Sequence, residues 1–460
     1  MSEQLELPVA DASQTASRFS VFRPIHYLGS KLRLVDVIRD VVNAVDPDHG
    51  PICDLFAGSG TVSLAFAQER RVIAVDIQEY SRVLCSALLY RQSIPLNCVS
   101  HVDDFVNRSK TSRALLQAIE PLAAYERDSI ADAIAGDPEQ LCDLLENGSL
   151  LIAQRGFITG GRRELQIALK QAAASLNEAR LLESSKSMVL RHFGGIYFSY
   201  RQAAVLDLIL ESVHTSEPDL RDFLLAPLLS TASNVVNTVG KHFAQPIRPR
   251  SKGGLPKRHL VRKIEEDRAI DVWSTYRGWF DRYRNLPASL HAHEALRADY
   301  RKALQSVDAS VSVVYADPPY TRDHYSRFYH VLETLCFRDD PKVSSVVMSG
   351  ARTPSRGLYR ESRHQSPFCI KSQAPSAFEA LFKGVREREI PLVVSYSPFA
   401  ESTRARPRLM SIEKINSLAK RYYRSVEVAS AGRIAHSKLN ATELNTGINY
   451  DAEVLLACVP

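Results

Sequence analysis

The stretch ICDLFAGSGTVSLAFAQERRVIAVD, residues 52–76, decides the fold of this chain. It begins with a strand-like run at Ile52–Phe56, passes through a glycine-containing turn into a helical pattern at Thr61–Gln68, and ends in a second strand-like run at Val72–Val75. Strand–helix–strand alternation with short connections is typical of a doubly wound parallel sheet. The sequence therefore predicts the α/β class.

The flanking segments extend this pattern. Apolar residues recur at helical spacing over 31–45, a second helix is predicted at Ser81–Tyr90, and a weaker strand is predicted at Cys98–Val102. From about 106 to 305 long helical patterns dominate, without buried-strand runs between them. Strand-like runs then resume, at Val311–Ala316, Leu392–Ser395, Val426–Val428 and Val454–Cys458.

The simplest organisation is one α/β domain that is split by an insertion. We expect a loose N-terminal arm at 1–20, a catalytic domain formed by 21–105 and 306–460, and a mostly helical insertion at 106–305.

Composition excludes several classes of protein. With 45% hydrophobic and 24% charged residues among 460, the chain can bury a core, so wholesale disorder is excluded. No apolar run reaches the length of a membrane helix, and the N-terminus lacks the layout of a signal peptide. The seven cysteines are scattered without a CxxC pair, which indicates neither a disulfide scaffold nor a zinc module. We therefore expect a cytoplasmic protein that contacts no membrane and holds no metal.

The net charge of +6 is modest, but one segment concentrates positive charge. Between Lys241 and Lys263 there are eight Lys and Arg residues and no acid, in a loop broken by prolines and glycines: Lys241, Arg248, Arg250, Lys252, Lys257, Arg258, Arg262 and Lys263. Uncompensated positive charges repel one another unless a polyanion binds them. The segment is therefore either a solvated loop or a nucleic-acid contact.

The first chemical motif is the glycine turn after the first strand. Gly58 and Gly60 allow a tight turn and a close backbone approach to a ligand, and the following helix presents free N–H groups. Asp76 ends the next strand, where a carboxylate can accept both ribose hydroxyls. Because Asp54 would repel a diphosphate but suits a cationic ammonium, these residues favour S-adenosylmethionine over NAD or ATP. The alternative is a purely structural turn.

The second motif is Asp317-Pro318-Pro319-Tyr320, directly after the strand-like run Val311–Ala316. The prolines stiffen the loop and remove backbone donors, which leaves carbonyl oxygens available. An acid, a fixed carbonyl and an aromatic face form a receptor for a planar group that bears an amine. The alternative is a proline-rich turn, but ligands of α/β sheets bind at the carboxyl ends of strands.

FxGxG followed by DPPY is the motif pair of amino-methyltransferases that act on DNA, and the chain resembles α-class N6-adenine DNA methyltransferases, the family of the DNA adenine methylases. Tyr27-Leu-Gly29-Ser-Lys31 looks like the family's N-terminal cofactor motif, and Asp104-Phe105 looks like its third-strand motif. The order of the motifs, with a long insertion before DPPY, is the α-class order.

The resemblance implies a Rossmann-like S-adenosylmethionine-dependent methyltransferase sheet, with the insertion as target-recognition domain. Asp317 and the carbonyl of Pro318 would accept hydrogen bonds from the amine of a flipped adenine in double-stranded DNA, and Tyr320 would stack on the base. The implied cofactor site comprises Tyr27, Gly29, Lys31, Asp54, Phe56, Gly58, Gly60, Asp76, Asp104 and Phe105. Lys31 would neutralise the methionine carboxylate, and Asp104-Phe105 would contact the cofactor's adenine.

Two further segments carry candidate DNA contacts. Arg352, Arg356, Arg360 and Arg363 lie in a polar stretch that is a candidate grip for phosphates beside the flipped base. The stretch Phe193–Gln202 is interpreted as a packed aromatic turn, with base readout by Arg201 and Gln202 as the alternative.

Other functions stay open at this stage. Cytosine-N4 methyltransferases usually carry Ser in place of Asp317, RNA or protein methyltransferases more often carry Asn, and a non-catalytic DNA-binding subunit would show a degraded motif. We therefore expect a site-specific adenine DNA methyltransferase of a restriction–modification or defence system. Its candidate partners are double-stranded DNA, which would place it at the nucleoid, and a cognate restriction endonuclease.

Overall fold

The computed structural model of the chain describes residues 22–27, 29, 31–89, 97–156, 161–322, 325–348, 351–397, 409–430 and 453–460. These residues form two compact units: Met1–Gln92 with Pro287–Ser326 and His364–Pro460, and Ser93–Leu286 with Arg327–Arg363. The expected N-terminal arm at 1–20 lies outside the described residues.

The first unit is built around a seven-stranded sheet. Its elements are α1 (Val35–Val45), β1 (Ile52–Asp54), α2 (Thr61–Phe66), β2 (Val72–Asp76), α3 (Glu79–Leu88), β3 (Glu294–Arg297), α15 (Tyr300–Ser306), β4 (Val313–Ala316), the 3₁₀ turn η3 (Pro367–Cys369), α18 (Ala374–Arg386), β7 (Leu392–Tyr396), α19 (Ile412–Ala419), β8 (Ser425–Ser430) and β9 (Val454–Val459). The strand order is β3-β2-β1-β4-β7-β9-β8. β3, β2, β1, β4 and β7 are parallel, whereas β9 runs antiparallel to both β7 and β8. The predicted α/β class with a largely parallel sheet is confirmed.

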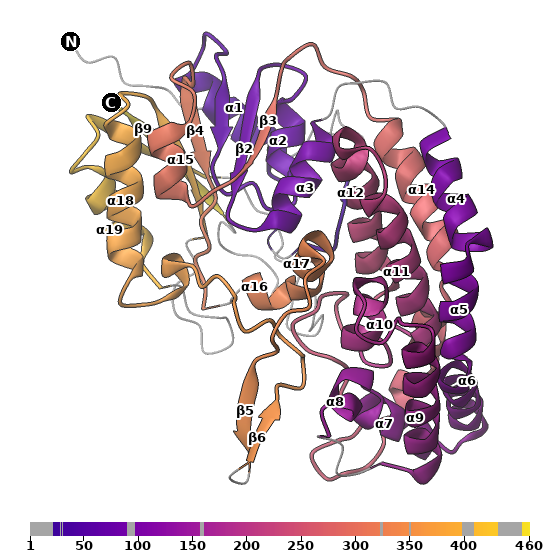
Figure 1. Ribbon diagram of the computed structural model, residues 1–460. Coiled ribbons are helices and arrows are strands. Elements are labelled where there is room, and N and C mark those ends of the chain that lie inside the picture. The colour runs from indigo at the N-terminus through magenta and orange to yellow at the C-terminus, as the bar shows by residue number, and fades with distance from the viewer. Residues whose placement is uncertain are drawn as a thin grey trace. The chain divides into compact units, whose positions relative to one another are not determined.

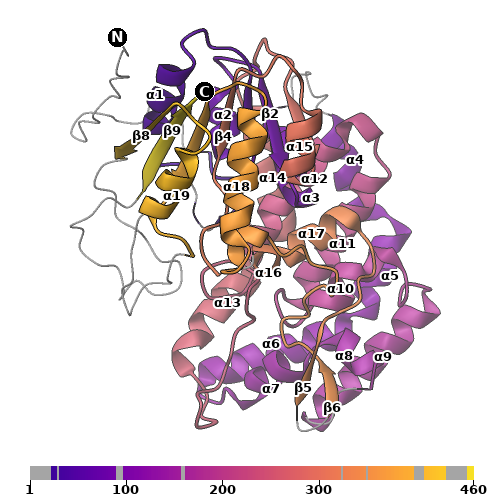
Figure 2. The same ribbon diagram turned by 90° about the vertical axis from the view of Figure 1, so that its left-hand side faces the viewer.

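Both faces of this sheet are covered, which explains why its strands are continuous apolar runs. Neighbouring residues of one strand point to opposite faces, so Ile52 packs with α1 and α2 while Cys53 packs with α15, α18 and α19. Figures 1 and 2 show these two groups of helices on opposite sides of the strands.

The order of the strands fixes where a ligand can bind. From β1 the chain moves outward to β2 and β3, whereas β4 pairs with the other edge of β1 and leads to β7. The sequence order therefore reverses between β1 and β4. In an open α/β sheet, a crevice forms at the carboxyl ends of the strands at such a reversal. Asp54 ends β1 and Asp317 follows β4, so both motifs lie at this crevice.

One strand prediction is wrong and one strand was not predicted. Residues 98–102 lie inside helix α4 (Asn97–Arg108), because Val102 and Val106, four residues apart, are its buried residues. The edge strand of the sheet is instead β3, within the range assigned to the insertion. Its residues are only partly buried, so its sequence carries no apolar run.

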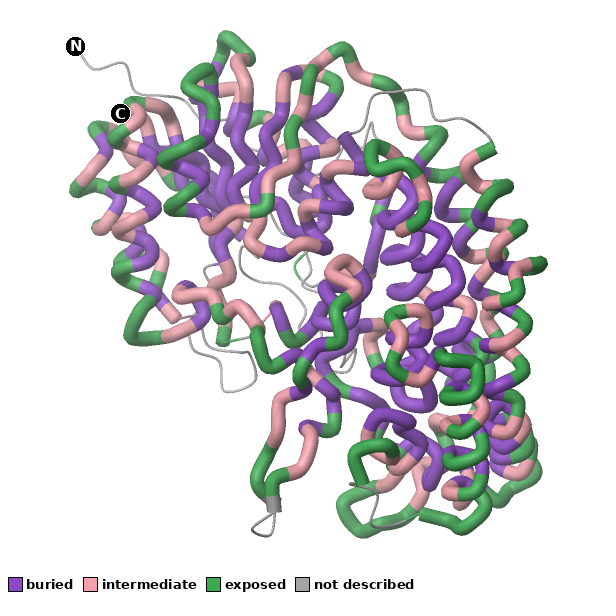
Figure 3. Tube along the Cα trace, in the orientation of Figure 1, coloured by how far each residue is buried: buried purple, intermediate pink, exposed green. Residues whose placement is uncertain are grey.

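The second unit is mostly helical. Its elements are α4, α5 (Lys110–Ala118), α6 (Glu120–Ala135), α7 (Glu139–Asn147), α8 (Leu150–Gln154), α9 (Arg163–Glu178), η1 (Ser185–Ser187), α10 (Met188–Phe193), α11 (Tyr200–His214), α12 (Pro218–Val235), η2 (Arg258–Leu260), α13 (Val261–Ala269), α14 (Val272–Arg284), α17 (His330–Phe337), β5 (Ser345–Met348) and β6 (Ala351–Pro354); α16 (Tyr325–Phe328) spans the boundary between the units. Figure 3 shows α11 and α12 buried along most of their length, as expected of helices that are apolar on all sides.

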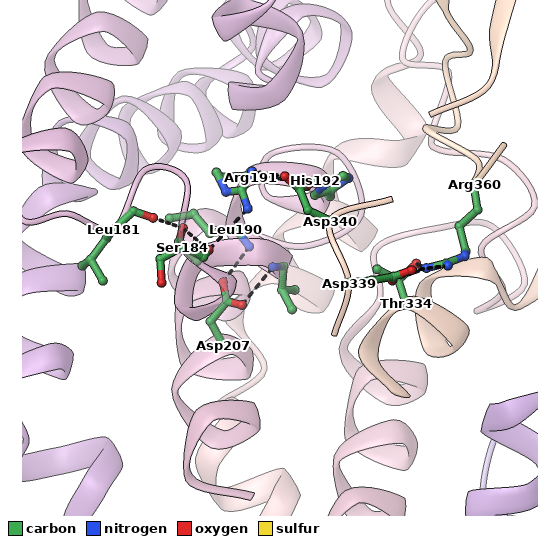
Figure 4. A network of polar contacts seen from close by, with 12 residues as sticks. Leu181, Ser184, Leu190, Arg191, His192, Asp207, Thr334, Asp339, Asp340 and Arg360 are labelled. Atoms are coloured by element: carbon green, nitrogen blue, oxygen red, sulfur yellow. Dashed lines mark hydrogen bonds and ion pairs between the residues drawn. The ribbon is translucent and has the colours of Figure 1, made fainter. Parts of the chain in front are cut away.

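Ion pairs fix residues 327–363 to the helices of this unit. Asp340 pairs with Arg191 and His192 of α10, and Asp339 binds Arg360 through two hydrogen bonds of 2.6 Å (Figure 4). Arg360 is buried and therefore holds the fold together, so it is not a phosphate contact.

The stretch Phe193–Gln202 is a packed turn, as predicted. Gln202 and Ser199 form a capping box at the start of α11, and the Gln202 amide donates to the carbonyls of Asp267 and Ile270. These bonds use the polar atoms of Gln202 inside the unit, so it does not read bases. None of the described helices is long and apolar enough to cross a membrane.

Candidate active site

A pocket in the first unit gathers residues from four neighbouring strand ends. Its lining comes from the turn after β1, the end of β2, the residues after β3, the DPPY loop after β4, the Tyr27–Lys31 segment and residues 364–369. Of the sequence-predicted residues it contains Tyr27, Gly29, Lys31, Asp54, Phe56, Gly58, Asp76, Asp317, Pro318, Pro319 and Tyr320.

The glycine turn is shaped by close contacts. Gly58 has a φ of +54°, and a Cβ atom there would lie 2.6 Å from the Tyr27 hydroxyl. Its N–H donates to Asp76 over 3.0 Å, which joins the turn to the end of β2. Gly60, with a φ of +74°, precedes α2 and packs on Leu88 of α3, so it supports the turn without lining the pocket.

Asp54 offers a negatively charged oxygen to the pocket. Its Oδ2 accepts a hydrogen bond of 2.6 Å from Ser63, whereas its buried Oδ1 has no hydrogen-bond partner among the described residues. Burial raises the pKa of Asp54 to about 7. A buried carboxylate oxygen without a donor suits a ligand that brings a positive charge or an N–H group.

Asp76 is less buried than Asp54 and is held on both oxygens. It accepts backbone N–H groups from Gly58 and Gln78, and burial still raises its pKa. Each carboxylate oxygen can accept a second hydrogen bond, so Asp76 retains capacity for hydroxyl groups.

Asp104 and Phe105 are not part of this pocket. They lie in α4, in the second unit, where Asp104 is 59% exposed and pairs with Arg108 one helical turn away. The assignment of these two residues to the third strand was wrong because no third strand exists there.

Asp299 and Tyr300 occupy the position that the sequence analysis gave to that pair. They follow β3 directly and line the pocket, with the Tyr300 ring 5.7 Å from the Phe56 ring. The Asp299 side chain also caps α15 by accepting the N–H of Arg301. The pattern of an acid followed by an aromatic residue at the start of a helix could have identified Asp299 and Tyr300, but β3 itself was not predicted.

Lys31 is buried between two carboxylates. Its Nζ lies 3.0 Å from Asp317 Oδ1 and 2.9 Å from Glu453 Oε1. Burial alone would lower the pKa of Lys31, but the charges of Asp317 and Glu453 outweigh it and hold this pKa well above its ordinary value. Glu453, directly before β9, was not predicted; it also accepts the Ser395 hydroxyl over 2.9 Å.

Asp317 has the most unusual electrostatics of the DPPY loop. Burial raises its pKa to about 7, with Lys31 opposing the shift and Glu453 adding to it. Its Oδ1 is within ion-pair distance of Lys31 but makes no hydrogen bond among the described residues. The carboxylate therefore keeps acceptor capacity for a ligand in the pocket.

Tyr320 packs against a buried aromatic residue. Tyr396 of β7 packs its ring edge-on against Tyr320 at 5.3 Å, and its hydroxyl donates to the carbonyl of Met410. Tyr396 is 1% exposed, so it is a core residue that orients Tyr320 and does not itself wall the pocket.

Acids from other segments neutralise part of the positive charge of the basic loop in the second unit. Lys241 pairs with Asp267 of α13, and Arg250 pairs with Glu139 and Glu146 of α7. Five of the remaining members of the predicted DNA-binding set are exposed: Arg248, Lys252, Arg258, Arg352 and Arg356. Lys257 is partly buried and donates to the carbonyl of Arg248. Arg352 lies on β6 and donates to Ser345 across the β5–β6 hairpin.

Comparison with known proteins confirms the resemblance seen in the sequence. The family described as D12 class N6 adenine-specific DNA methyltransferase matches residues 27–126 and 281–351. These ranges include the glycine turn, β3, Asp299 and the DPPY loop, so most of the pocket lies within the matched residues.

Three curated relatives are similar to the chain in sequence. The chain is 24% identical over 81% of its length to Modification methylase LlaI of Lactococcus lactis subsp. lactis, 23% identical over 93% to Type II methyltransferase M.FokI of Planomicrobium okeanokoites, and 24% identical over 78% to Type II methyltransferase M.NlaIII of Neisseria lactamica. The chain spans about half the length of the first two relatives, 46% and 52%, and 80% of the third. No solved structure matches it.

Proposed function

We propose that this chain is a DNA methyltransferase that transfers a methyl group from S-adenosylmethionine to the exocyclic N6 of adenine in duplex DNA, as the modification component of a restriction–modification system. The observation that carries the proposal is the meeting, in one pocket, of the glycine turn after β1 with Asp317–Tyr320 after β4. The match to the adenine-specific family supports N6 of adenine over N4 of cytosine.

The pocket fits S-adenosylmethionine on chemical grounds. The unpartnered Oδ1 of Asp54 suits the ammonium of the methionine part, and Asp76 suits the ribose hydroxyls. Phe56, Tyr300 and Asp299 form an aromatic and acidic end that suits the adenine ring and its amine. When bound, this cofactor supplies an electrophilic methyl group on a sulfonium.

Lys31 takes a different role from the one the motif implied. Its ammonium is already bound between Asp317 and Glu453, so we assign it to the orientation of Asp317 and leave the cofactor carboxylate to other groups.

Asp317 and the carbonyl of Pro318 would act on the target amine. Both accept hydrogen bonds from its two protons, which draws the nitrogen lone pair out of conjugation with the ring and stabilises the positive charge that develops on nitrogen. The bound cofactor would supply the methyl group, and the Asp317 carboxylate would be placed to receive the one proton that the methylated nitrogen must release. Tyr320, braced by Tyr396, would stack on the extruded base.

We also propose that the second unit recognises the target sequence, as the predicted insertion would. Its boundaries, 93–286 and 327–363, differ from the predicted 106–305, because β3 joins the sheet and residues 327–363 join the helices. The partners would be double-stranded DNA and an endonuclease with the same recognition sequence.

The proposal is tested with purified protein, labelled S-adenosylmethionine and unmethylated duplex DNA. We expect label in N6-methyladenine after digestion to nucleosides. We also expect Asp317→Ala to abolish transfer while cofactor binding, measured by calorimetry, stays within about threefold. Label in N4-methylcytosine, in RNA or in protein would reject the substrate assignment.

A further inference from the structure

Two arginines of the second unit lie over one tyrosine ring, and two more lie on the segments packed beside it. The guanidinium carbons of Arg327 and Arg363 lie 5.2 and 5.4 Å from the centre of the Tyr359 ring. Arg356 reaches the neighbouring loop and donates to the carbonyl of Ile247 over 2.7 Å, directly before Arg248. These four arginines come from three segments of the chain, so only folding brings them together.

The base of this arginine cluster is rigid. The Tyr359 hydroxyl donates to the carbonyl of Ala244, and the Tyr359 ring packs edge-on against buried His330 at 5.1 Å. Tyr197, which is fully buried, donates to the carbonyls of both Phe243 and Gly357 and so ties the same two segments together. A guanidinium that stacks on a fixed ring loses less conformational freedom when it binds a ligand.

The cluster carries positive charge that the protein itself does not neutralise. Within the described part of the chain, none of the four guanidinium groups lies within 4.0 Å of a carboxylate, whereas Arg250, Arg338 and Arg360 all do. Burial lowers the pKa of both Arg356 and Arg363, and the neighbouring charges of Arg248 and Arg327 lower them further; Glu146 is the one acid that acts on Arg356 in the opposite direction. Like charges held this close are destabilising unless an anion binds them.

The geometry favours phosphate as that anion. Arginine that stacks through its face leaves its N–H edge free for two parallel hydrogen bonds to phosphate oxygens. Arg248, Arg327 and Arg356 are exposed and Arg363 is half-buried. Arg356 donates to the Ile247 carbonyl and Arg363 to the Ser344 hydroxyl, which uses only part of the five N–H donors of each guanidinium. Several guanidinium groups side by side match the regular charges of a duplex backbone, whose binding releases counterions.

We propose that Arg248, Arg327, Arg356 and Arg363, arranged around Tyr359, bind the phosphate backbone of duplex DNA. This inference rests on the proposed function and names a surface for it. It differs from the basic loop of the sequence analysis, because Lys241 and Arg250 are neutralised by acids and Lys257 donates to the backbone carbonyl of Arg248 without stacking on Tyr359.

The test compares two double variants of the full chain. Arg327→Gln/Arg363→Gln removes two cluster charges. Arg108→Gln/Arg127→Gln removes two charges from side chains of the same unit that are 78% and 61% exposed and have their own acid partners. Binding of a fluorescently labelled DNA duplex is measured by anisotropy over a series of KCl concentrations, and calorimetry with S-adenosylmethionine confirms that each variant is folded.

We expect the cluster variant to reduce the slope of log Kd against log KCl by about two, roughly one for each arginine. At physiological ionic strength this corresponds to roughly 30-fold weaker binding. The control pair should leave both quantities unchanged. Arg327→Lys/Arg363→Lys keeps the charges, so it should restore most of the slope while losing the stacked geometry.

A cluster variant that binds DNA with the wild-type affinity and slope overturns the inference. If the wild-type protein methylates DNA in that case, the proposed function stands and only this surface is wrong. A wild-type protein that neither binds nor methylates duplex DNA, or that prefers duplex RNA, rejects the proposed function and the inference with it.

Discussion

Lys31 donates a hydrogen bond to Glu453, 422 residues away in the sequence, and through that bond it is positioned 3.0 Å from Asp317. The Lys31 ammonium lies 2.9 Å from Glu453 Oε1 and 3.0 Å from Asp317 Oδ1, so the two carboxylates share it. Glu453 thus takes up part of the bonding capacity of Lys31 and leaves Asp317 capacity to accept from the target amine.

Replacement of Glu453 should expose this role. In Glu453→Gln, Lys31 loses one of its two anionic partners and is expected to bind the Asp317 carboxylate more tightly, so the methyl-transfer rate constant should fall by roughly 10- to 100-fold. The KM for S-adenosylmethionine should change little, because Glu453 does not line the pocket. Single-turnover kinetics measures the rate constant.

Glu427→Gln is the matched control. Glu427 lies on β8 and pairs in register with Ala457 of β9, the strand that directly follows Glu453. It should behave as wild type. A Glu453→Gln enzyme that loses cofactor affinity instead of rate would assign Glu453 to folding of the pocket.

The rate of methyl transfer should depend on pH through Asp317. The pKa of this carboxyl is raised to about 7 by burial, and only its ionised form carries the charge that stabilises the amine and can take up its proton. The rate constant should therefore rise with pH up to about 7 and level off above it. The charges that face Asp317 are Lys31, Glu453 and Asp54, and of these Asp54 also has a pKa of about 7.

The two carboxyls can be separated by experiment. Ionisation of Asp54 should lower the KM for S-adenosylmethionine as pH rises, whereas ionisation of Asp317 should raise the rate constant at saturating cofactor. In Asp54→Asn the pH dependence of KM should disappear while that of the rate constant remains. A rate constant that falls between pH 6 and 7 would contradict the assignment of Asp317.

Asp299 should contribute to cofactor binding and Asp104 should not. Asp299→Asn keeps an acceptor for the cap of α15 but removes the charge from the pocket, so the affinity for S-adenosylmethionine should fall by roughly tenfold. Asp104→Asn, on the surface of α4, should bind as wild type. Calorimetry on the two variants decides between them, and the reverse result would restore the prediction made from sequence.

Gly58→Ala should damage the pocket through Tyr27. An added Cβ would lie 2.6 Å from the Tyr27 hydroxyl and would sit on a backbone with a φ of +54°. The backbone strain costs about 1–2 kcal/mol, and displacement of Tyr27 should weaken cofactor binding further. Because the nearest contact is the hydroxyl, Gly58→Ala/Tyr27→Phe should recover part of the affinity.

Gly278→Ala provides the comparison in a helix. Its added Cβ meets nothing within 4 Å, so this variant should gain about 0.5–1 kcal/mol of unfolding free energy. Denaturant unfolding measures both effects. Equal behaviour of Gly58→Ala and Gly278→Ala would show that the turn tolerates a side chain.

The sequence was most informative where its signals are local. The turn around Gly58 and the Asp317–Tyr320 loop are short motifs next to apolar strands, and both lie where the pattern predicted. β3 was not predicted because this edge strand is half-exposed and carries no apolar run. Without β3, the acid that follows the third strand was assigned to Asp104.

Long-range partners could not be predicted from one sequence. The acids that neutralise Lys241 and Arg250 come from α13 and α7, so the basic loop looked uncompensated. Glu453 could not be linked to Lys31, because the two residues are 422 positions apart in the sequence and no local pattern joins them.

The pairing of β9 with β7 also has a consequence for biosynthesis. Glu453 reaches Lys31 only when β9 has been translated and inserted between β7 and β8. A nascent chain therefore carries the glycine turn and the DPPY loop long before its Lys31 is anchored. We expect a chain whose β9 has not yet been translated to modify no DNA, which delays activity until the sheet is assembled.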